Sequence, residues 1–237
     1  MAERANPAYG TPNWEMIGCW LHLEPRDDGP FWALNLMKYH PVARYGDDTP
    51  AVSGREADDA YAPLGPLAAI GAAVAFLGDV DDQRLGEPTW DRIGIVRYPS
   101  RAAFFAMQQR DDFKAQHVHK EAGMEFTIVM ACLPVVHDAD AALADGSLVL
   151  LVERGADLAG AVPADASLVA EFRVEGVIVG DGRTFDRVRF VRAADAEVVD
   201  ALVVTASSAD EAHVMVLDPS IDNLVDTIVT APAATTG

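Results

Sequence analysis

The chain has 237 residues, a formal net charge of −19 and no run of apolar residues long enough for a membrane-spanning helix. An acidic surface repels phosphate backbones and anionic lipids, so we expect neither nucleic-acid nor membrane partners. The first residues lack the basic-then-apolar order of a signal peptide, and two isolated cysteines form neither a disulfide framework nor a zinc site. These features predict a cytoplasmic globular protein.

The first half of the chain, after an extension at residues 1–30, predicts one βαββαβ unit at 31–134. Alternation of apolar and polar residues at 14–25 indicates a short strand within the extension. Ser100, which follows Pro99, is suited to cap the helix that starts after it. In chain order we expect a strand at 31–41, a helix at 55–71, strands at 72–80 and 90–99, helices at 101–110 and 111–123, and a strand at 125–134.

The second half repeats this order at 147–237, after an expected linker at 135–146. The clearest sign is that "WDRIGIVRYP" returns as "FDRVRFVRA", with Trp90 and Phe185 lying 95 residues apart. Segment 156–164 reads as a short helix or a loop. The other elements are expected as strands at 147–155, 167–176, 185–193 and 211–219 and helices at 194–206 and 220–231.

A repeated βαββαβ order predicts an α+β fold of two ferredoxin-like units. One face of each sheet lacks helical cover, and packing the two sheets face to face covers both. We therefore expect an intramolecular α/β barrel, in which one chain supplies what two subunits usually supply. The molecule is then a monomer with an internal pseudo-dimer, or a homodimer formed through the remaining sheet edges.

Four blocks of residues 31–134 resemble a bacterial domain-of-unknown-function family of the dimeric α+β barrel superfamily. That superfamily also holds antibiotic-biosynthesis monooxygenases, muconolactone isomerases and EthD-like proteins. The resemblance implies the fold and no single reaction, and residues 147–237 look like a degenerate copy. The four blocks are NLMKY at 35–39, the pair Trp90-Asp91, YPSRAAF at 98–104 and HKEAGM at 119–124.

Asn35 is the first candidate catalytic residue, because it interrupts an apolar strand and a buried amide needs hydrogen-bond partners. Its amide either polarises a substrate carbonyl or bonds to a neighbouring strand or loop. Tyr39 lies on the same strand face and is expected to assist. His40 lies on the opposite face; it is a further catalytic candidate because histidine titrates near neutrality, or it is a solvated residue at the end of the strand.

His119 is the second candidate, as a general base or ligand contact, because it matches the family's histidine at the end of a helix. The alternative is that it only stabilises the helix C-terminus. His117 lies two positions away on a different helix face, so the two histidines cannot share a metal.

Substrate contacts are expected from aromatic side chains of the first half and from one arginine. The aromatics either line a ligand cavity or form ordinary core. Because the Asp-Arg pair recurs at Asp186-Arg187, in a half that lacks the asparagine and the histidine, Arg92 is an architectural residue or a ligand for a substrate anion. The candidates are Trp32, Phe76, Trp90, Arg92, Tyr98 and Phe104.

These features favour a small-molecule enzyme that acts on a hydrophobic or aromatic metabolite. The reaction would be proton transfer, as in an isomerase, cyclase or lyase, or cofactor-independent oxygenation. The sequence has no phosphate-binding loop and no serine nucleophile elbow, and we expect neither a metal nor another cofactor. Two alternatives stay open: a non-catalytic protein that binds a small ligand, and a haem-binding barrel, since the resemblance includes relatives that hold haem through histidine.

Overall fold

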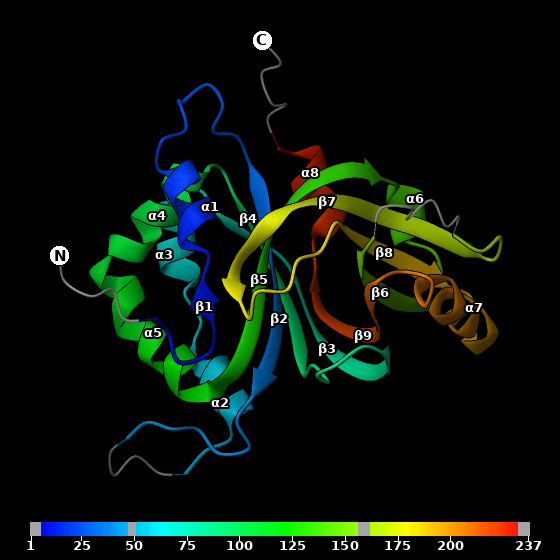
Figure 1. Cartoon of the computed structure of the whole chain (residues 1–237), viewed down its shortest axis with the longest axis horizontal. Helices are drawn as coiled ribbons and strands as arrows, with labels where there is room; N and C mark the ends of the chain where they lie inside the picture. The colour runs from blue at the N-terminus through cyan, green and yellow to red at the C-terminus, as the bar shows by residue number, and fades with distance from the viewer. Residues whose placement is uncertain (1–5, 47–50, 156–161, 232–237) are drawn as a thin grey trace.

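Eight antiparallel strands close into a barrel in the computed structural model, which describes residues 6–46, 51–155 and 162–231 (Figure 1). The hydrogen-bonded order is β7-β5-β2-β4-β3-β9-β6-β8, and pairing of β8 with β7 closes the ring. A short strand, β1 (Thr11–Pro12), adds to β7 outside the ring. The barrel strands are β2 (Phe31–Tyr39), β3 (Ala73–Leu85), β4 (Arg92–Tyr98), β5 (Met124–His137), β6 (Ser147–Arg154), β7 (Ala166–Gly180), β8 (Arg187–Ala193) and β9 (Glu211–Asp222).

Each half of the chain contributes four strands in ferredoxin-like order. The first half supplies β5-β2-β4-β3 and the second half supplies β9-β6-β8-β7. The second strand of one unit pairs with the fourth strand of the other at both joints, β3 with β9 and β7 with β5. The expected fold, two ferredoxin-like repeats in one intramolecular barrel, is confirmed.

Helices α1 to α5 and α7 lie outside the barrel, most of them over the first half (Figure 1). Helices α1 to α5 cover one side, and α7 lies on the opposite side. No helix among the described residues is long and apolar enough to cross a membrane. The helices are α1 (Trp14–Trp20), α2 (Gly54–Ala60), α3 (Leu64–Ala69), α4 (Arg101–Gln109), α5 (Asp111–Gly123), α6 (Ala139–Ala142), α7 (Ala196–Ala206) and α8 (Leu224–Val229).

The segment expected as a strand at 14–25 is instead the helix α1, so that prediction was wrong. The side chain of Asn13 caps this helix by accepting a hydrogen bond from the Met16 amide at 3.0 Å. Met16, Ile17 and Trp20 have the spacing of one helical face, and Trp20 packs on Phe31 with ring centroids 5.2 Å apart. Burial of this face outweighs the short alternation in the sequence.

The segment expected as a linker is partly regular secondary structure. Within the expected linker at 135–146, β5 continues to His137 and α6 spans Ala139–Ala142. The segment expected as a short helix or loop at 156–164 lies largely outside the described residues. The helix expected after Ser100 begins there, because the Ser100 hydroxyl accepts a hydrogen bond from the Ala103 amide at 3.0 Å.

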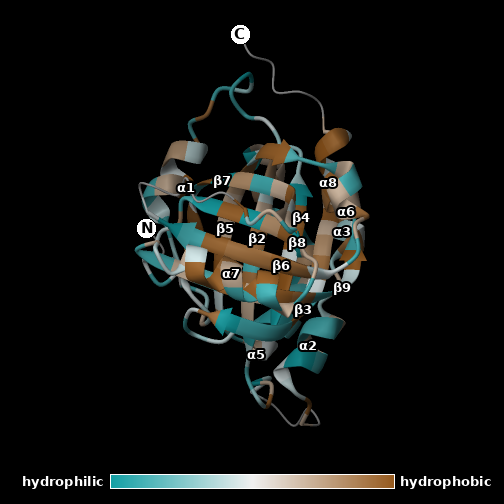
Figure 2. Ribbon diagram, turned by 90° about the vertical axis from the view of Figure 1, so that its right-hand side faces the viewer, coloured by the Kyte–Doolittle hydropathy of each residue, from teal (hydrophilic) through white to brown (hydrophobic). Residues whose placement is uncertain are grey.

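Side chains from both halves fill the interior of the barrel. Trp32, Leu34 and Leu36 of β2 alternate into it and are at most 1% exposed. Helix α8 packs into the same cluster, and the Trp32 indole donates a hydrogen bond to the Thr227 hydroxyl at 3.0 Å. Phe76 and Phe190 also meet there, with ring centroids 5.4 Å apart. The interior is therefore core, and Figure 2 shows the apolar strands that surround it.

The aspartate of the repeated Asp-Arg pair has the same structural role in both halves. The Asp91 carboxylate accepts the Tyr39 amide at 2.7 Å, and the Asp186 carboxylate accepts the Gly155 amide at 2.8 Å. In both cases the accepted amide belongs to the end of the first strand of its unit or to the residue just after it. This part of the repeat is therefore architectural.

Candidate active site

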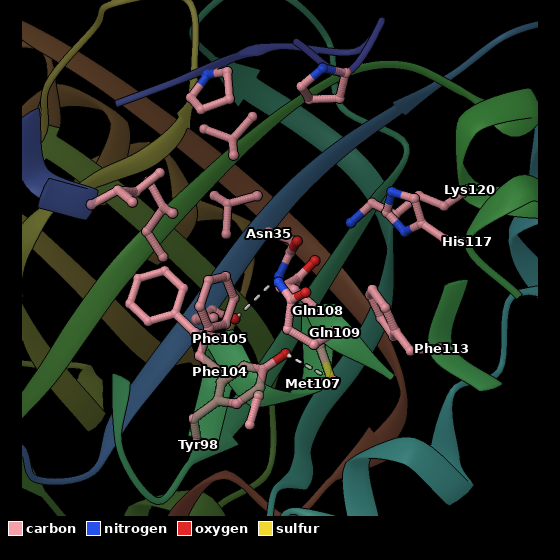
Figure 3. Close-up of a pocket in the computed structure, with 18 of the residues that line it drawn as sticks. Asn35, Tyr98, Phe104, Phe105, Met107, Gln108, Gln109, Phe113, His117 and Lys120 are labelled. Carbon is pink, nitrogen blue, oxygen red and sulfur yellow. Dashed lines mark hydrogen bonds between the residues drawn. The ribbon is translucent and has the colours of Figure 1, made fainter. Parts of the chain in front are cut away.

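A cavity of about 930 Å³ lies on the outer face of the first sheet, below helices α4 and α5 (Figure 3). The N-terminal segment around β1 and α1 supplies another wall. Few polar side chains reach a mainly apolar lining, which is the usual form of a small-molecule site. The polar side chains are Asn6, Asn35, Gln108, Gln109, His117, Lys120 and Glu121, and the aromatic side chains and Met107 make up much of the rest: Tyr9, Trp14, Tyr61, Tyr98, Phe104, Phe105, Met107 and Phe113.

Asn35 forms part of the cavity floor because odd-numbered residues of β2 face the helices. Its Nδ2 donates to the Ala33 carbonyl at 3.2 Å, and no described residue donates to its Oδ1. The residue directly opposite on β4 is Gly94, so no side chain covers the amide from that strand. Asn35 therefore keeps an acceptor, and one of its two N–H groups, for a ligand.

His117 on α5 pairs with Tyr9 from the N-terminal segment. The Tyr9 hydroxyl and His117 Nε2 are 3.0 Å apart. Burial, and then the nearby charge of Lys120, lowers the pKa of His117 to about 4, so the imidazole is neutral at pH 7. Burial also raises the pKa of Tyr9, which keeps the phenol protonated. A neutral imidazole bonded to a phenol can accept or relay a proton.

Lys120 is on the same face of α5 and lies between two aromatic rings. Its Nζ is 5.5 Å from the ring centroid of Tyr9 and 5.7 Å from that of Tyr61. Burial lowers the pKa of Lys120, while the charges of Asp58 and Glu121 oppose this shift. Figure 3 shows Lys120 and His117 reaching from α5 toward the space above Asn35.

Of the four predicted catalytic residues, the structure places only Asn35 in this cavity. The Tyr39 hydroxyl donates to the Asp58 carboxylate at 2.5 Å, away from the cavity lining. His40 lines a neighbouring hollow of about 700 Å³. His119 turns to the other side of α5, where its Nδ1 lies 2.8 Å from the Tyr45 hydroxyl.

Of the predicted substrate contacts, Tyr98 and Phe104 line the cavity, whereas Trp32 and Phe76 belong to the barrel core. Trp90 is also in that core; it stacks on Phe126 with centroids 5.6 Å apart, and its indole donates to His213 Nδ1 at 3.3 Å.

Arg92 is 6% exposed and is held by three carboxylates of the first half. Its guanidinium lies 3.0 Å from Asp58, 2.8 Å from Asp59 and 3.1 Å from Asp79. It is therefore a structural ion-pair centre beside the cavity and is not available for a substrate anion.

Sequence reasoning missed Tyr9, Tyr61, His117 and Lys120. The helix itself held a usable sign, since Phe113, His117 and Lys120 are spaced i, i+4, i+7 and share one face. Tyr9 had no such sign, because its place depends on β1 pairing with β7 of the other half.

The donor set of the cavity does not fit haem, the group implied by one alternative. Haem needs an axial ligand such as a histidine nitrogen that is free to bind iron. His117 Nε2 is bonded to Tyr9, and its Nδ1 is buried. Among the described residues, no group of three or more His, Cys, Asp or Glu side chains could hold a metal ion.

Comparison with known proteins finds no matching family model and no matching curated protein. Among solved structures, the RPA0582 protein of unknown function from Rhodopseudomonas palustris is 26% identical, covering 54% of this chain and 98% of that chain with a TM-score of 0.47. A mutant chlorite dismutase from Candidatus Nitrospira defluvii is 8% identical, covering 85% of this chain and 94% of that chain with a TM-score of 0.45.

Proposed function

We propose that the cavity of the first half binds a hydrophobic or aromatic small molecule and catalyses proton transfer on it. The observation that supports this most is the approach of Asn35 and the His117–Tyr9 pair to one largely apolar space. An apolar wall selects the ligand body, and a few fixed polar groups orient it. The reaction class is isomerase, cyclase or lyase.

Each polar residue has a distinct role in this proposal. Asn35 donates its free N–H to a substrate carbonyl oxygen and stabilises the enolate that forms when an adjacent C–H loses its proton. His117 takes up a proton by relay: the Tyr9 hydroxyl passes its own proton to Nε2 and accepts the one from the C–H bond, and the reverse transfer returns a proton to another atom. Tyr9 orients the imidazole ring. The same deprotonation is the first step of cofactor-independent oxygenation.

The test is exchange of acidic C–H protons of simple aromatic ketones, such as acetophenone and indanone, in deuterated water. We expect the wild-type protein to catalyse exchange, and Asn35→Ala and His117→Gln each to reduce its rate about 100-fold or more. His119→Gln is the matched control, because His119 is on the same helix but outside the cavity. If ketones bind and no exchange above the buffer rate occurs, the protein is a binder and the proposal is wrong.

A further inference from the structure

Lys120 is a cation without a carboxylate partner in a strongly acidic protein. The chain has 37 acidic and 18 basic residues, and only three of the latter are lysines. Among the described residues no carboxylate oxygen lies within 4.0 Å of the Lys120 Nζ. Arg92 and Arg101, the buried arginines near this end of the molecule, each contact carboxylates. In a chain with so many acidic side chains, the unpaired ammonium of Lys120 needs a separate explanation.

Aromatic rings provide part of the stabilisation that Lys120 lacks. The face of an aromatic ring attracts a cation, and Lys120 lies near the rings of both Tyr9 and Tyr61. Rings do not neutralise the charge, however, and burial still disfavours the ammonium form. A ligand anion would complete the site and form a charge-assisted hydrogen bond.

Extending the proposed function, on which this inference rests, we propose that the substrate is an aromatic or hydrophobic carboxylate and that Lys120 binds its carboxylate. The acid group lies at the Tyr9–Tyr61 end, and the apolar body lies along Phe104, Phe105 and Phe113. The reacting carbonyl then faces Asn35. Glu121 also borders the cavity, but it is 44% exposed and directed at His117, with an oxygen 3.6 Å from Nε2.

Naphthoate and naphthamide test this proposal, because they share a ring system and differ in charge at neutral pH. Calorimetric titration of the wild-type protein should show at least tenfold tighter binding of naphthoate. Lys120→Met should abolish this preference while it leaves naphthamide affinity within about twofold. Lys120→Arg keeps the charge and should retain a preference. Lys114→Met, on the same helix but with a 54% exposed side chain, should behave as wild type.

Three results would overturn the inference in distinguishable ways. Equal binding of the two compounds by the wild type, or an unchanged preference in Lys120→Met, refutes the role of Lys120. The proposed proton transfer still stands if naphthamide binds and ketone exchange depends on Asn35 and His117. If neither naphthalene compound binds, the cavity is not an aromatic-ligand site, and both proposals fail. Thermal unfolding shows whether Lys120→Met is folded. If Lys120→Met does not fold, the binding preference of Lys120→Arg is used to test the inference instead.

Discussion

The two sheets of the barrel share one strand register but carry different side chains on their outer faces. In the first sheet Asn35 lies opposite Gly94, and in the second sheet Leu151 lies opposite Arg189. Gly94 and Arg189 are 95 residues apart, the same separation as Trp90 and Phe185, so they are equivalent positions. The floor of the cavity in one half thus corresponds to a leucine and an arginine in the other.

Arg189 covers the outer face of the second sheet at a position where the first sheet has a glycine. Its side chain is fully buried and donates to the Glu153 carboxylate at 3.0 and 2.7 Å. Leu202 of α7 is also fully buried on this face, so the helix packs directly on the sheet. In the first sheet the Met37 methyl carbon lies over Gly94, 3.2 Å from where a Cβ would stand, and the cavity lies beside it at Asn35. One copy of the fold therefore has a packed outer face, and the other has a cavity.

The buried ion pair of the second half gives the largest expected effect. Glu153 is the counterpart of Met37, because each faces the arginine of its Asp-Arg pair across the strands. Glu153→Gln removes the charge that the buried guanidinium of Arg189 contacts, and should lower the free energy of unfolding by about 3–5 kcal/mol. Met37→Leu, the matched change in the first half, should cost less than about 1.5 kcal/mol. Urea denaturation measures both, and equal losses would mean that the two faces are not stabilised differently.

Protonation of two buried histidines, one in each half, should lower the free energy of unfolding by an intermediate amount at acidic pH. Burial lowers the pKa of both His117 and His213 to about 4, from an ordinary value of 6.5. Between pH 6.5 and 4 the unfolded chain gains a proton that the folded protein resists, so stability falls with pH. The loss is absent above pH 6.5 and complete below about pH 4. Each histidine should contribute about 2 kcal/mol of it by pH 5.

Urea denaturation at pH 7 and pH 5 checks this for wild type, His117→Gln and His213→Gln. Between pH 7 and pH 5, the free energy of unfolding of each variant should fall by about 2 kcal/mol less than that of the wild type. Only His117 borders the cavity, so naphthamide should change its NMR titration and leave that of His213 unchanged. A ligand effect on His213 alone would place binding at the wrong end of the barrel.

The barrel could be predicted from the sequence because strand alternation and a long repeat survive in both halves. Asn35 could also be assigned to one face of the sheet, because side chains alternate between the two faces along a strand. Periodicity cannot say which face of a two-sided sheet carries a cavity. Trp32 and Phe76 were therefore expected at the ligand, although they face the barrel interior.

The rest of the site depends on contacts that no local pattern contains. The resemblance drew attention to His119, whereas the phase of α5 brings His117 and Lys120 to the cavity. Tyr9 comes from a segment read as a loose extension, and α1 beside it was read as a strand. The sequence around Gly94 did not indicate a role for this residue, because that role depends on its pairing with Asn35 across the strands.

Replacing Asn35 with the residue found at its equivalent in the second half gives the smallest expected change in stability. Asn35→Leu, which copies Leu151, should raise the free energy of unfolding by about 1 kcal/mol, because an amide with unused hydrogen-bonding groups becomes apolar. It should also abolish ketone exchange, since no donor then faces the carbonyl. Thermal unfolding and the exchange assay measure the two effects on one sample. Destabilisation of more than about 1 kcal/mol would show that the amide is a structural group, and the contrast between the two faces would then lie in packing alone.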